Sequence, residues 1–437
     1  MCNFKGRREF RVAPFLLPTV LRTMSRPVII IGAGIVGLST AWALRQRSVE
    51  SVIIDRDVLG DGASYGNAGL IIYGHAPLNQ PGMSRQGIGM LLNRQSPLYI
   101  RPSLRPGLLK WLWGFHQHCT APHLERSMDV LAAMGWGSKQ CFEEIIEKTG
   151  IDADWQINGW LDLCPTLEDL DHAENETALV GPYGFTSTRL EGQDFHSAHP
   201  GFTSSVAGAV HYHHSATLCP RSFSLGLRDA LVERGISIRE GVEAKRIETS
   251  EGQVTRVRLA DGNSIEADQV VLAAGTWSTD LARSINLSIP MEPARGYHRD
   301  LIDLPYIPKV GGVIRNTSIA FTPMFDRLRL AGTLEIAGYN RPWMKERLDN
   351  LSTGAAESIQ GISTAHTVGE WAGYRPCTPD GLPVVGKSSS VDGLHIATGH
   401  AMMGMTLGPY TGEMIARSLC GETQDIDDSL LTPDRFN

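Results

Sequence analysis

The clearest hydrophobic pattern lies near the N-terminus. The apolar run from Val28 to Ile31 leads into a glycine-rich turn, and helix-forming residues follow from Ile35 to Leu44. A second run, Ser51 to Ile54, comes next. Short apolar runs bounded by turn residues are typical of strands buried on both faces of a parallel sheet. The pattern therefore predicts a strand–helix–strand unit at this point of the chain.

Further along, the pattern predicts both helices and strands. Residues 125–149 and 220–234 are typical of helices, and Pro220 at the first turn fits a helix start. The segments expected to form strands are 236–242, 254–259 and 264–267 (a hairpin around Asp261-Gly262-Asn263), 269–274, 328–333, and the beginning of a final strand–turn–helix stretch, 394–419.

These elements predict an α/β fold (α+β overall) built on a Rossmann-like nucleotide-binding domain that is discontinuous in sequence. Its segments are expected at 25–74, 205–285 and 365–437. The segments 75–204 and 286–364 are expected to form an inserted substrate domain of helices and mixed sheet.

Composition narrows the class of protein. The 437 residues carry a net charge of −7 and no basic stripe, which argues against nucleic-acid binding. Seven scattered cysteines favour a reducing compartment over a disulfide framework, so we expect a cytoplasmic protein. No apolar run reaches about 18 residues, so no membrane-spanning helix is expected.

Residues 1–24 differ from the rest of the chain. They are rich in basic residues, and their apolar patch from Val12 to Leu21 is broken by Pro14 and Pro18. We expect an unstructured N-terminal extension, with Met24 as the working start. A targeting segment and an ordered extension remain alternatives.

The turn after the first strand has the form G-x-G-x-x-G, with Gly32, Gly34 and Gly37. The first glycine permits the turn, the second lets a pyrophosphate approach the backbone, and the third lets helix and strand pack closely. Asp55 ends the second strand, where an acid binds the ribose hydroxyls. An acid there indicates FAD or NAD and argues against NADP.

Four segments occur in an order that resembles one family. They are the nucleotide motif, the loop Ala63-Ser64-Tyr65-Gly66-Asn67-Ala68-Gly69, the strand end 273–278, and the stretch 371–381 followed by 399–409. From Pro27 to the helix after Gly412, the chain resembles the D-amino acid oxidase superfamily of FAD-dependent amine oxidoreductases. Within it, the chain is most similar to bacterial D-amino acid dehydrogenases and cis-4-hydroxy-D-proline dehydrogenases.

The resemblance implies a FAD-binding domain, non-covalent FAD, and oxidation of a D-amino acid or cyclic D-imino acid by hydride transfer from the α-carbon to flavin N5. Electrons would pass to a quinone or another carrier. A glycine turn that opens the last helix would place backbone N–H groups near the flavin's negative end. The expected cofactor-binding residues are Gly32, Gly34, Ile35, Val36, Gly37, Asp55, Ser64, Asn67, Ala68, Gly69, Val242, Ala274, Gly275, Trp277, Gly404, Met405 and Thr406.

The expected substrate site is built around an arginine, because a carboxylate in an apolar pocket calls for a bidentate partner. Arg375 and Arg295 are the two candidates, and Tyr297 is the third expected catalytic residue. His298 and Tyr339 are candidates for shaping the pocket, and His400 is expected to support the flavin turn. The triplet His211, His213 and His214 lacks a suitably spaced carboxylate or cysteine, so no metal is expected.

Several alternatives remain open at this stage. An NAD-dependent dehydrogenase and a flavin-stabilised assembly factor are rival functions, and an oxygen-using oxidase of glycine or sarcosine is a third. Met324 stands where the glycine-oxidase branch carries its arginine, which argues against glycine oxidase itself. The segment 108–115 is expected to pack in the core, and a helix on the inner-membrane surface is the alternative.

Overall fold

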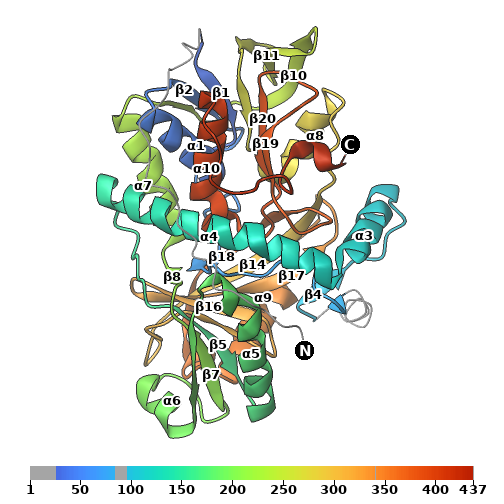
Figure 1. Cartoon of the computed structure of the whole chain (residues 1–437). Coiled ribbons are helices and arrows are strands. Elements are labelled where there is room, and N and C mark those ends of the chain that lie inside the picture. Colours follow the sequence, from blue (N-terminus) through green and yellow to red (C-terminus); the bar gives the residue numbers. More distant parts are fainter. Residues whose placement is uncertain (1–25, 84–95, 340, 437) are drawn as a thin grey trace.

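The computed structural model describes residues 26–83, 96–339 and 341–436. The expectations for residues 1–24 lie outside these ranges. Figure 1 shows a parallel sheet with its helices at one end of the molecule and a larger sheet at the other, with the long helix α4 (Ala121–Thr149) running between them. The predicted mixed α/β fold is confirmed.

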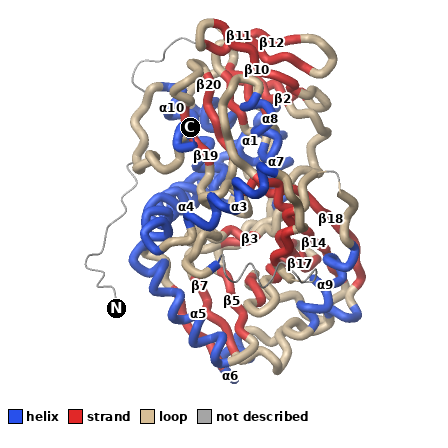
Figure 2. Tube along the Cα trace, turned by 90° about the vertical axis from the view of Figure 1, so that its right-hand side faces the viewer, coloured by secondary structure: helices blue, strands red, loops and turns tan. Residues whose placement is uncertain are grey.

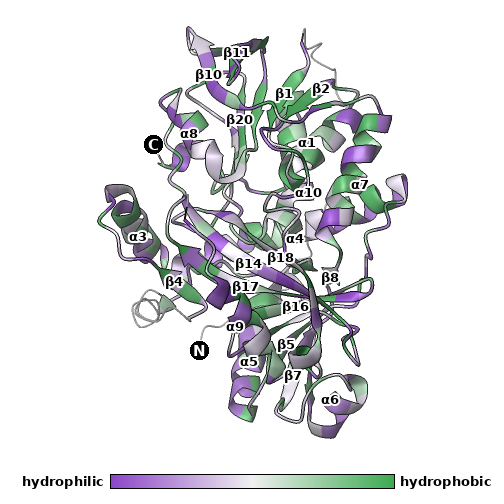
Figure 3. Cartoon of the chain, turned by 180° about the vertical axis from the view of Figure 1, so that it is seen from behind, coloured by the Kyte–Doolittle hydropathy of each residue, from purple (hydrophilic) through white to green (hydrophobic). Residues whose placement is uncertain are grey.

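The first sheet has six strands in the order β19-β20-β13-β1-β2-β9, all parallel to their neighbours except β19. The strands are β1 (Val28–Ile31), β2 (Ser51–Ile54), β9 (Ser237–Arg239), β13 (Val270–Leu272), β19 (Val384–Lys387) and β20 (Leu394–Thr398). All four residues of β1 are buried, as expected for a strand covered on both faces. Figure 3 shows the hydrophobic character of β1 and β2.

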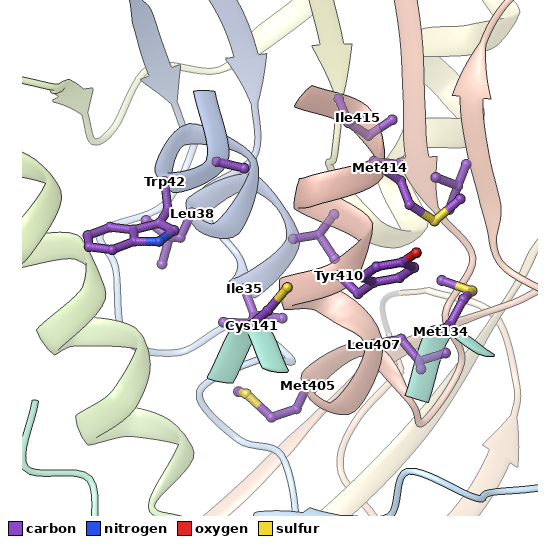
Figure 4. Packing of buried hydrophobic residues seen from close by; sticks show 14 of the residues in the cluster. Ile35, Leu38, Trp42, Met134, Cys141, Met405, Leu407, Tyr410, Met414 and Ile415 are labelled. Atoms are coloured by element: carbon purple, nitrogen blue, oxygen red, sulfur yellow. The ribbon is translucent and has the colours of Figure 1, made fainter. Parts of the chain in front are cut away.

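Two helices pack on this sheet side by side. They are α1 (Ile35–Gln46) and α10 (Gly404–Cys420), and a Cβ on Gly412 of α10 would overlap the backbone of Ser39 in α1. Figure 4 shows Leu407 and Tyr410 of α10 beside Met134 of α4, whereas Ile35 of α1 lies against another side of α10, where a Cβ on Gly408 would be 3.0 Å from its side chain. The C-terminal helix is therefore part of the core around the first glycine turn.

The larger sheet has nine strands, and Figure 2 shows β18, β14 and β17 side by side within it. Its main order is β18-β14-β17-β16-β15-β5-β7-β6, with β4 paired to β17. The strands are β4 (Leu98–Ile100), β5 (Trp160–Cys164), β6 (Ser187–Glu191), β7 (Gly208–Tyr212), β14 (Glu292–Ile302), β15 (Gly312–Ile314), β16 (Ile319–Met324), β17 (Arg327–Ile336) and β18 (His366–Cys377).

Smaller elements complete the fold. Strands β10 (Ala244–Ser250), β11 (Gln253–Leu259) and β12 (Ser264–Glu266) form an antiparallel sheet that confirms the predicted hairpin, and β3 (Leu70–Ile71) pairs with β8 (Ala216–Thr217). The remaining α-helices in the described ranges are α3 (Pro106–His118), α5 (Leu167–Val180), α6 (Gly192–Ala198), α7 (Pro220–Glu233), α8 (Ser278–Arg283) and α9 (Lys345–Ala356). None of the described helices is long and apolar enough to cross a bilayer.

Two segments of the chain belong to a different sheet from the one expected. Residues 208–212 and 366–377 lie within the segments expected for the nucleotide-binding domain, yet they form β7 and β18 of the nine-stranded sheet. Both strands are antiparallel to distant partners, and such pairing leaves no local signal. The strand expected at 236–242 is also shorter, since only Ser237–Arg239 pairs with β2. The division of the chain into two domains stays a prediction.

Candidate active site

A cavity of about 1500 Å³ lies where the C-terminal ends of the parallel strands meet the nine-stranded sheet. Most of the expected site residues line it. They are Gly32, Gly34, Ile35, Val36, Asp55, Ser64, Asn67, Ala68, Val242, Ala274, Gly275, Trp277, Gly404, Met405, Thr406, Tyr297 and Arg375. Three expected residues, Gly37, Gly69 and Arg295, are not among the lining residues.

The glycine turn is tied directly to the end of β2. Gly32 has φ +113°, and a Cβ there would overlap the Ala273 carbonyl, so only glycine suits this turn. The Ala33 amide donates to Asp55 Oδ2 at 2.7 Å, and the Asp57 amide donates to Asp55 Oδ1 at 3.0 Å. Burial raises the pKa of Asp55, although these two hydrogen bonds oppose the rise. Each carboxylate oxygen still has a lone pair for a ribose hydroxyl.

The loop from Asp61 to Gly69 closes over the start of α1 and is held from the opposite side. Its Ser64 Oγ accepts the Ile35 amide at 2.9 Å. Side chains of the nine-stranded sheet hold three of its backbone carbonyls. Trp371 Nε1 donates to Asp61 O at 2.8 Å, His298 Nδ1 to Gly66 O at 2.8 Å, and Arg329 Nη1 to Asn67 O at 2.7 Å.

His298 and Arg329 belong to one buried cluster on neighbouring strands. The His298 ring stacks on Trp371 with 5.4 Å between ring centroids. Burial lowers the pKa of His298 to about 4, and the nearby Arg329 adds to this. The imidazole is therefore neutral at pH 7 and carries its proton on Nδ1, where it can donate to the loop.

The N-terminal turn of α10 faces the cavity with Gly404, Met405 and Thr406. His400 Nε2 lies 2.9 Å from Thr411 Oγ1, which is about two helical turns into α10. Burial lowers the pKa of His400 to about 3, so its ring stays neutral. The contact between His400 and Thr411 is suited to hold the turn at the start of α10 in place.

Of the two arginine candidates, Arg375 is the one that lines the cavity. Its Nη1 donates to the Thr333 carbonyl at 2.8 Å, and no carboxylate among the described residues forms an ion pair with it. Burial lowers the pKa of the guanidinium, which nevertheless remains charged. A partly buried cation without an acidic partner is well suited to bind an anionic ligand group.

Arg295 and Tyr297 direct their polar atoms elsewhere. Arg295 donates to the backbone carbonyls of Arg341 and Pro342 at 2.8 and 2.9 Å, and to the Tyr374 hydroxyl. The Tyr297 hydroxyl donates to Glu335 Oε2 at 2.6 Å. Between the two arginine candidates, the arrangement favours Arg375.

Helix α3 provides an apolar wall of the cavity through Trp111, Leu112 and Phe115. Trp111 is buried and its Nε1 donates to the Cys377 carbonyl at 2.8 Å. Burial raises the pKa of the Cys377 thiol to about 12, so this cysteine is not a thiolate at neutral pH. The expected core packing of 108–115 therefore holds for one side of α3 only, since Leu109 and Trp113 are 50% and 62% exposed.

Comparison with known proteins places this geometry in context. The family described as FAD dependent oxidoreductase (DAO) matches residues 27–418. A D-amino acid dehydrogenase of Methylobacterium nodulans is 29% identical over 416 residues, covering 94% of this chain and 99% of the relative. One of Xanthobacter autotrophicus is 28% identical over 416 residues, with the same coverage of 94% and 99%.

Solved structures share the fold. Glycine oxidase from Bacillus cereus superposes with a TM-score of 0.73 at 20% identity, covering 91% of this chain and 96% of that one. L-proline dehydrogenase from P. horikoshii superposes with a TM-score of 0.75 at 18% identity, covering 94% and 97%.

Proposed function

Because the chain belongs to the DAO family of FAD-dependent oxidoreductases, we propose that it dehydrogenates a D-amino acid or a cyclic D-imino acid. The proposed cyclic substrates are D-proline and cis-4-hydroxy-D-proline. The full-length similarity to relatives named D-amino acid dehydrogenase supports this class. The substrate amine would lose a hydride and a proton, which together carry two electrons, to become an imine. The imine then hydrolyses in water.

FAD is the cofactor of this family, and the lining of the cavity fits it. The glycine turn and the start of α1 would hold the pyrophosphate, and Asp55 would accept the ribose hydroxyls. The first turn of α10 would face the flavin ring with its backbone N–H groups. When bound, FAD supplies a two-electron acceptor for the hydride that leaves the substrate α-carbon.

The observation that carries the proposal is Arg375, a partly buried guanidinium in the same cavity without an acidic partner among the described residues. Its fork would bind the substrate carboxylate and so orient the α-carbon. The apolar wall of α3 would exclude water from the reacting atoms.

We further propose that electrons pass to a quinone or another carrier rather than to oxygen, and that α3 contacts a membrane surface. Leu104, Leu109 and Trp113 are 89%, 50% and 62% exposed, and Arg101 and Lys110 lie beside them in the sequence. An exposed apolar side with flanking cations is typical of an interfacial helix. Oxidation of glycine or sarcosine by oxygen is the second candidate, and the shared fold with glycine oxidase is its support.

The decisive experiment is anaerobic reduction of the purified yellow protein by a panel of compounds. The panel contains D-amino acids, D-proline, hydroxyprolines, glycine and sarcosine. We expect the flavin absorbance to bleach with a D-amino or cyclic D-imino acid, and a dye to be reduced faster than oxygen. Bleaching only by glycine or sarcosine, with matching peroxide formation, would favour the oxidase. Bound FAD that no compound bleaches would contradict the proposal and favour an assembly role.

A further inference from the structure

We propose that Gly296 is a positioning residue for carboxylate recognition, because the absence of a side chain at this position lets the Arg375 guanidinium lie against the strand backbone. The inference rests on the proposed function, since it assigns the geometry of the carboxylate-binding group. It concerns a residue that touches neither cofactor nor substrate and acts through Arg375.

The contact between Gly296 and the Arg375 guanidinium follows from the register of β14 and β18. Ala294 pairs with Arg375, and Gly296 pairs with Gly373 two residues along each strand. Residues two apart on a strand share a face, so Arg375 and Gly296 lie on the same face of the sheet. The three atoms nearest to a Cβ placed on Gly296 are Cζ, Nη1 and Nη2 of Arg375, and all three would overlap it. The guanidinium therefore rests directly against the strand backbone.

A bulge on the other side of β14 fixes one edge of the guanidinium. The register of β14 and β17 shifts between Arg295 and Tyr297, so Thr333 and Leu334 both lie opposite Gly296. Thr333 has φ +60°, a backbone conformation that is rare for a β-branched residue. Its carbonyl accepts Arg375 Nη1 at 2.8 Å. Strain of this kind persists where the surrounding structure enforces it, often at ligand sites.

Together, the glycine and the bulge hold a planar cation in one orientation. One of the five guanidinium N–H groups is used by Thr333, which leaves the others for a bidentate carboxylate. Any side chain at position 296 would lift the guanidinium off the strand and turn its fork away from the present direction. The effect would fall on carboxylate ligands and spare neutral ones.

Glycine is not required at position 296 by its own backbone. Its φ is not positive, so alanine can adopt the same conformation. The expected conflict is with Arg375, and removal of that side chain should relieve it. Gly369 on β18 offers a matched control, because a Cβ there would meet Asp300 atoms at an ordinary 3.7 Å and the residue does not line the cavity.

The test is a double-mutant cycle of Gly296→Ala and Arg375→Ala, with Gly369→Ala as control. The readouts are flavin content, KM and kcat for the D-amino acid that bleaches the wild type, and the same constants for the matching amine without a carboxylate. We expect Gly296→Ala to retain FAD and to raise KM for the acid at least about tenfold, which corresponds to about 1.4 kcal/mol. The amine constants should stay within about twofold of the wild type. In the Arg375→Ala background, Gly296→Ala should change KM for the acid less than about twofold.

Other outcomes also decide the matter. An unchanged KM in Gly296→Ala, or an equal rise in the Arg375→Ala background, would overturn the inference. If Gly296→Ala fails to fold while the double variant folds, the conflict with Arg375 is supported. If both fail, Gly296 is needed for another reason and the inference is wrong.

A second measurement separates this inference from the proposed function. Propionate and propionamide are nearly isosteric, and their binding can be followed by perturbation of the flavin absorbance without turnover. If no compound of the panel bleaches the wild type, the proposed function fails. Loss of propionate binding in both Gly296→Ala and Arg375→Ala would still support the positioning role of Gly296. Propionate binding that is unaffected by Gly296→Ala would refute this role.

Discussion

Arg329 on β17 and Asp300 on β14 form a buried pair with two parallel hydrogen bonds, Nε to Oδ1 at 2.7 Å and Nη2 to Oδ2 at 2.8 Å. The remaining Nη1 donates to the Asn67 carbonyl of the loop that lines the cofactor cavity. Burial would by itself raise the pKa of Asp300, but the hydrogen bonds and charge of Arg329 hold it below its ordinary value. The pair thus ties the nine-stranded sheet to the loop that covers the start of α1.

Replacing Arg329 with glutamine should destabilise the protein by about 3–5 kcal/mol, because it leaves the Asp300 carboxylate buried without a cation. The loop should also lose an anchor, so FAD should dissociate more readily. Thermal unfolding with and without added FAD measures both effects. A variant with wild-type stability and flavin content would contradict this role, and Arg327→Gln on the exposed end of the same strand is the control.

His298 should make stability depend on pH. Its pKa is lowered to about 4 in the folded state, whereas the unfolded value is about 6.5, so the unfolded chain binds more protons between these values. Stability contributed by this site is complete above about pH 6.5 and falls as the pH drops toward 4, by about 3 kcal/mol in all. Denaturant unfolding of His298→Asn across this range should show a shallower loss than the wild type. Identical pH profiles would exclude a contribution from His298.

Asp55→Ala should weaken FAD binding at least about tenfold without changing substrate preference, because each charge-assisted hydrogen bond contributes about 1.5–3 kcal/mol. The substitution also frees the Ala33 and Asp57 amides, which loosens the glycine turn. Titration of the apoprotein with FAD, followed by flavin fluorescence, gives the affinity. Asp229→Ala is the matched control, because the Asp229 side chain is exposed on α7. Normal flavin occupancy in Asp55→Ala would show that the carboxylate is not needed.

Arg375→Lys keeps the charge but loses the planar fork, so we expect KM for the amino acid to rise at least about tenfold. Turnover should fall as well if the carboxylate sets the direction of the α-C–H bond. Arg375→Ala should lose most of the preference for the acid over the matching amine, while FAD content stays normal. Retention of that preference would exclude Arg375 as the carboxylate anchor.

Leu109→Ser and Trp113→Ser should reduce sedimentation of the protein with vesicles rich in anionic lipid. Both side chains are largely exposed on α3, and burial of such a side chain contributes about 1.5–3 kcal/mol. Leu167, which is 58% exposed at the start of α5, provides the control substitution Leu167→Ser. Equal sedimentation of all variants, or none by the wild type, would argue against a membrane contact through α3.

The parts of the fold that follow from local pattern were predictable. The apolar run Val28–Ile31, the glycines after it and Asp55 lie within thirty residues, and their meaning depends on neighbours in sequence. The hairpin around Asp261-Gly262-Asn263 was predictable for the same reason. Arg329 was missed, because its role arises only when β17 and β14 pair and the loop at Asn67 folds over them.

Thr333 and Gly296 illustrate two kinds of missing signal. A β-branched residue in a left-handed bulge contradicts its own backbone preference, so no sequence rule would select Thr333. Gly296 did carry a signal, because a glycine inside a strand often marks a close approach of another group. Which group approaches depends on the register of β18, whose partner strand lies more than sixty residues earlier.

The strand order of the six-stranded sheet has a consequence for biosynthesis. The glycine turn at residue 32 leaves the ribosome long before β20 and α10, which complete its surroundings and begin at residues 394 and 404. At elongation rates of about 5–20 residues per second, the nascent chain waits roughly 20–75 s before the cofactor cavity can close. During that interval the apolar side of α1 has no α10 to cover it, so newly made chains need protection from aggregation until α10 has been synthesised.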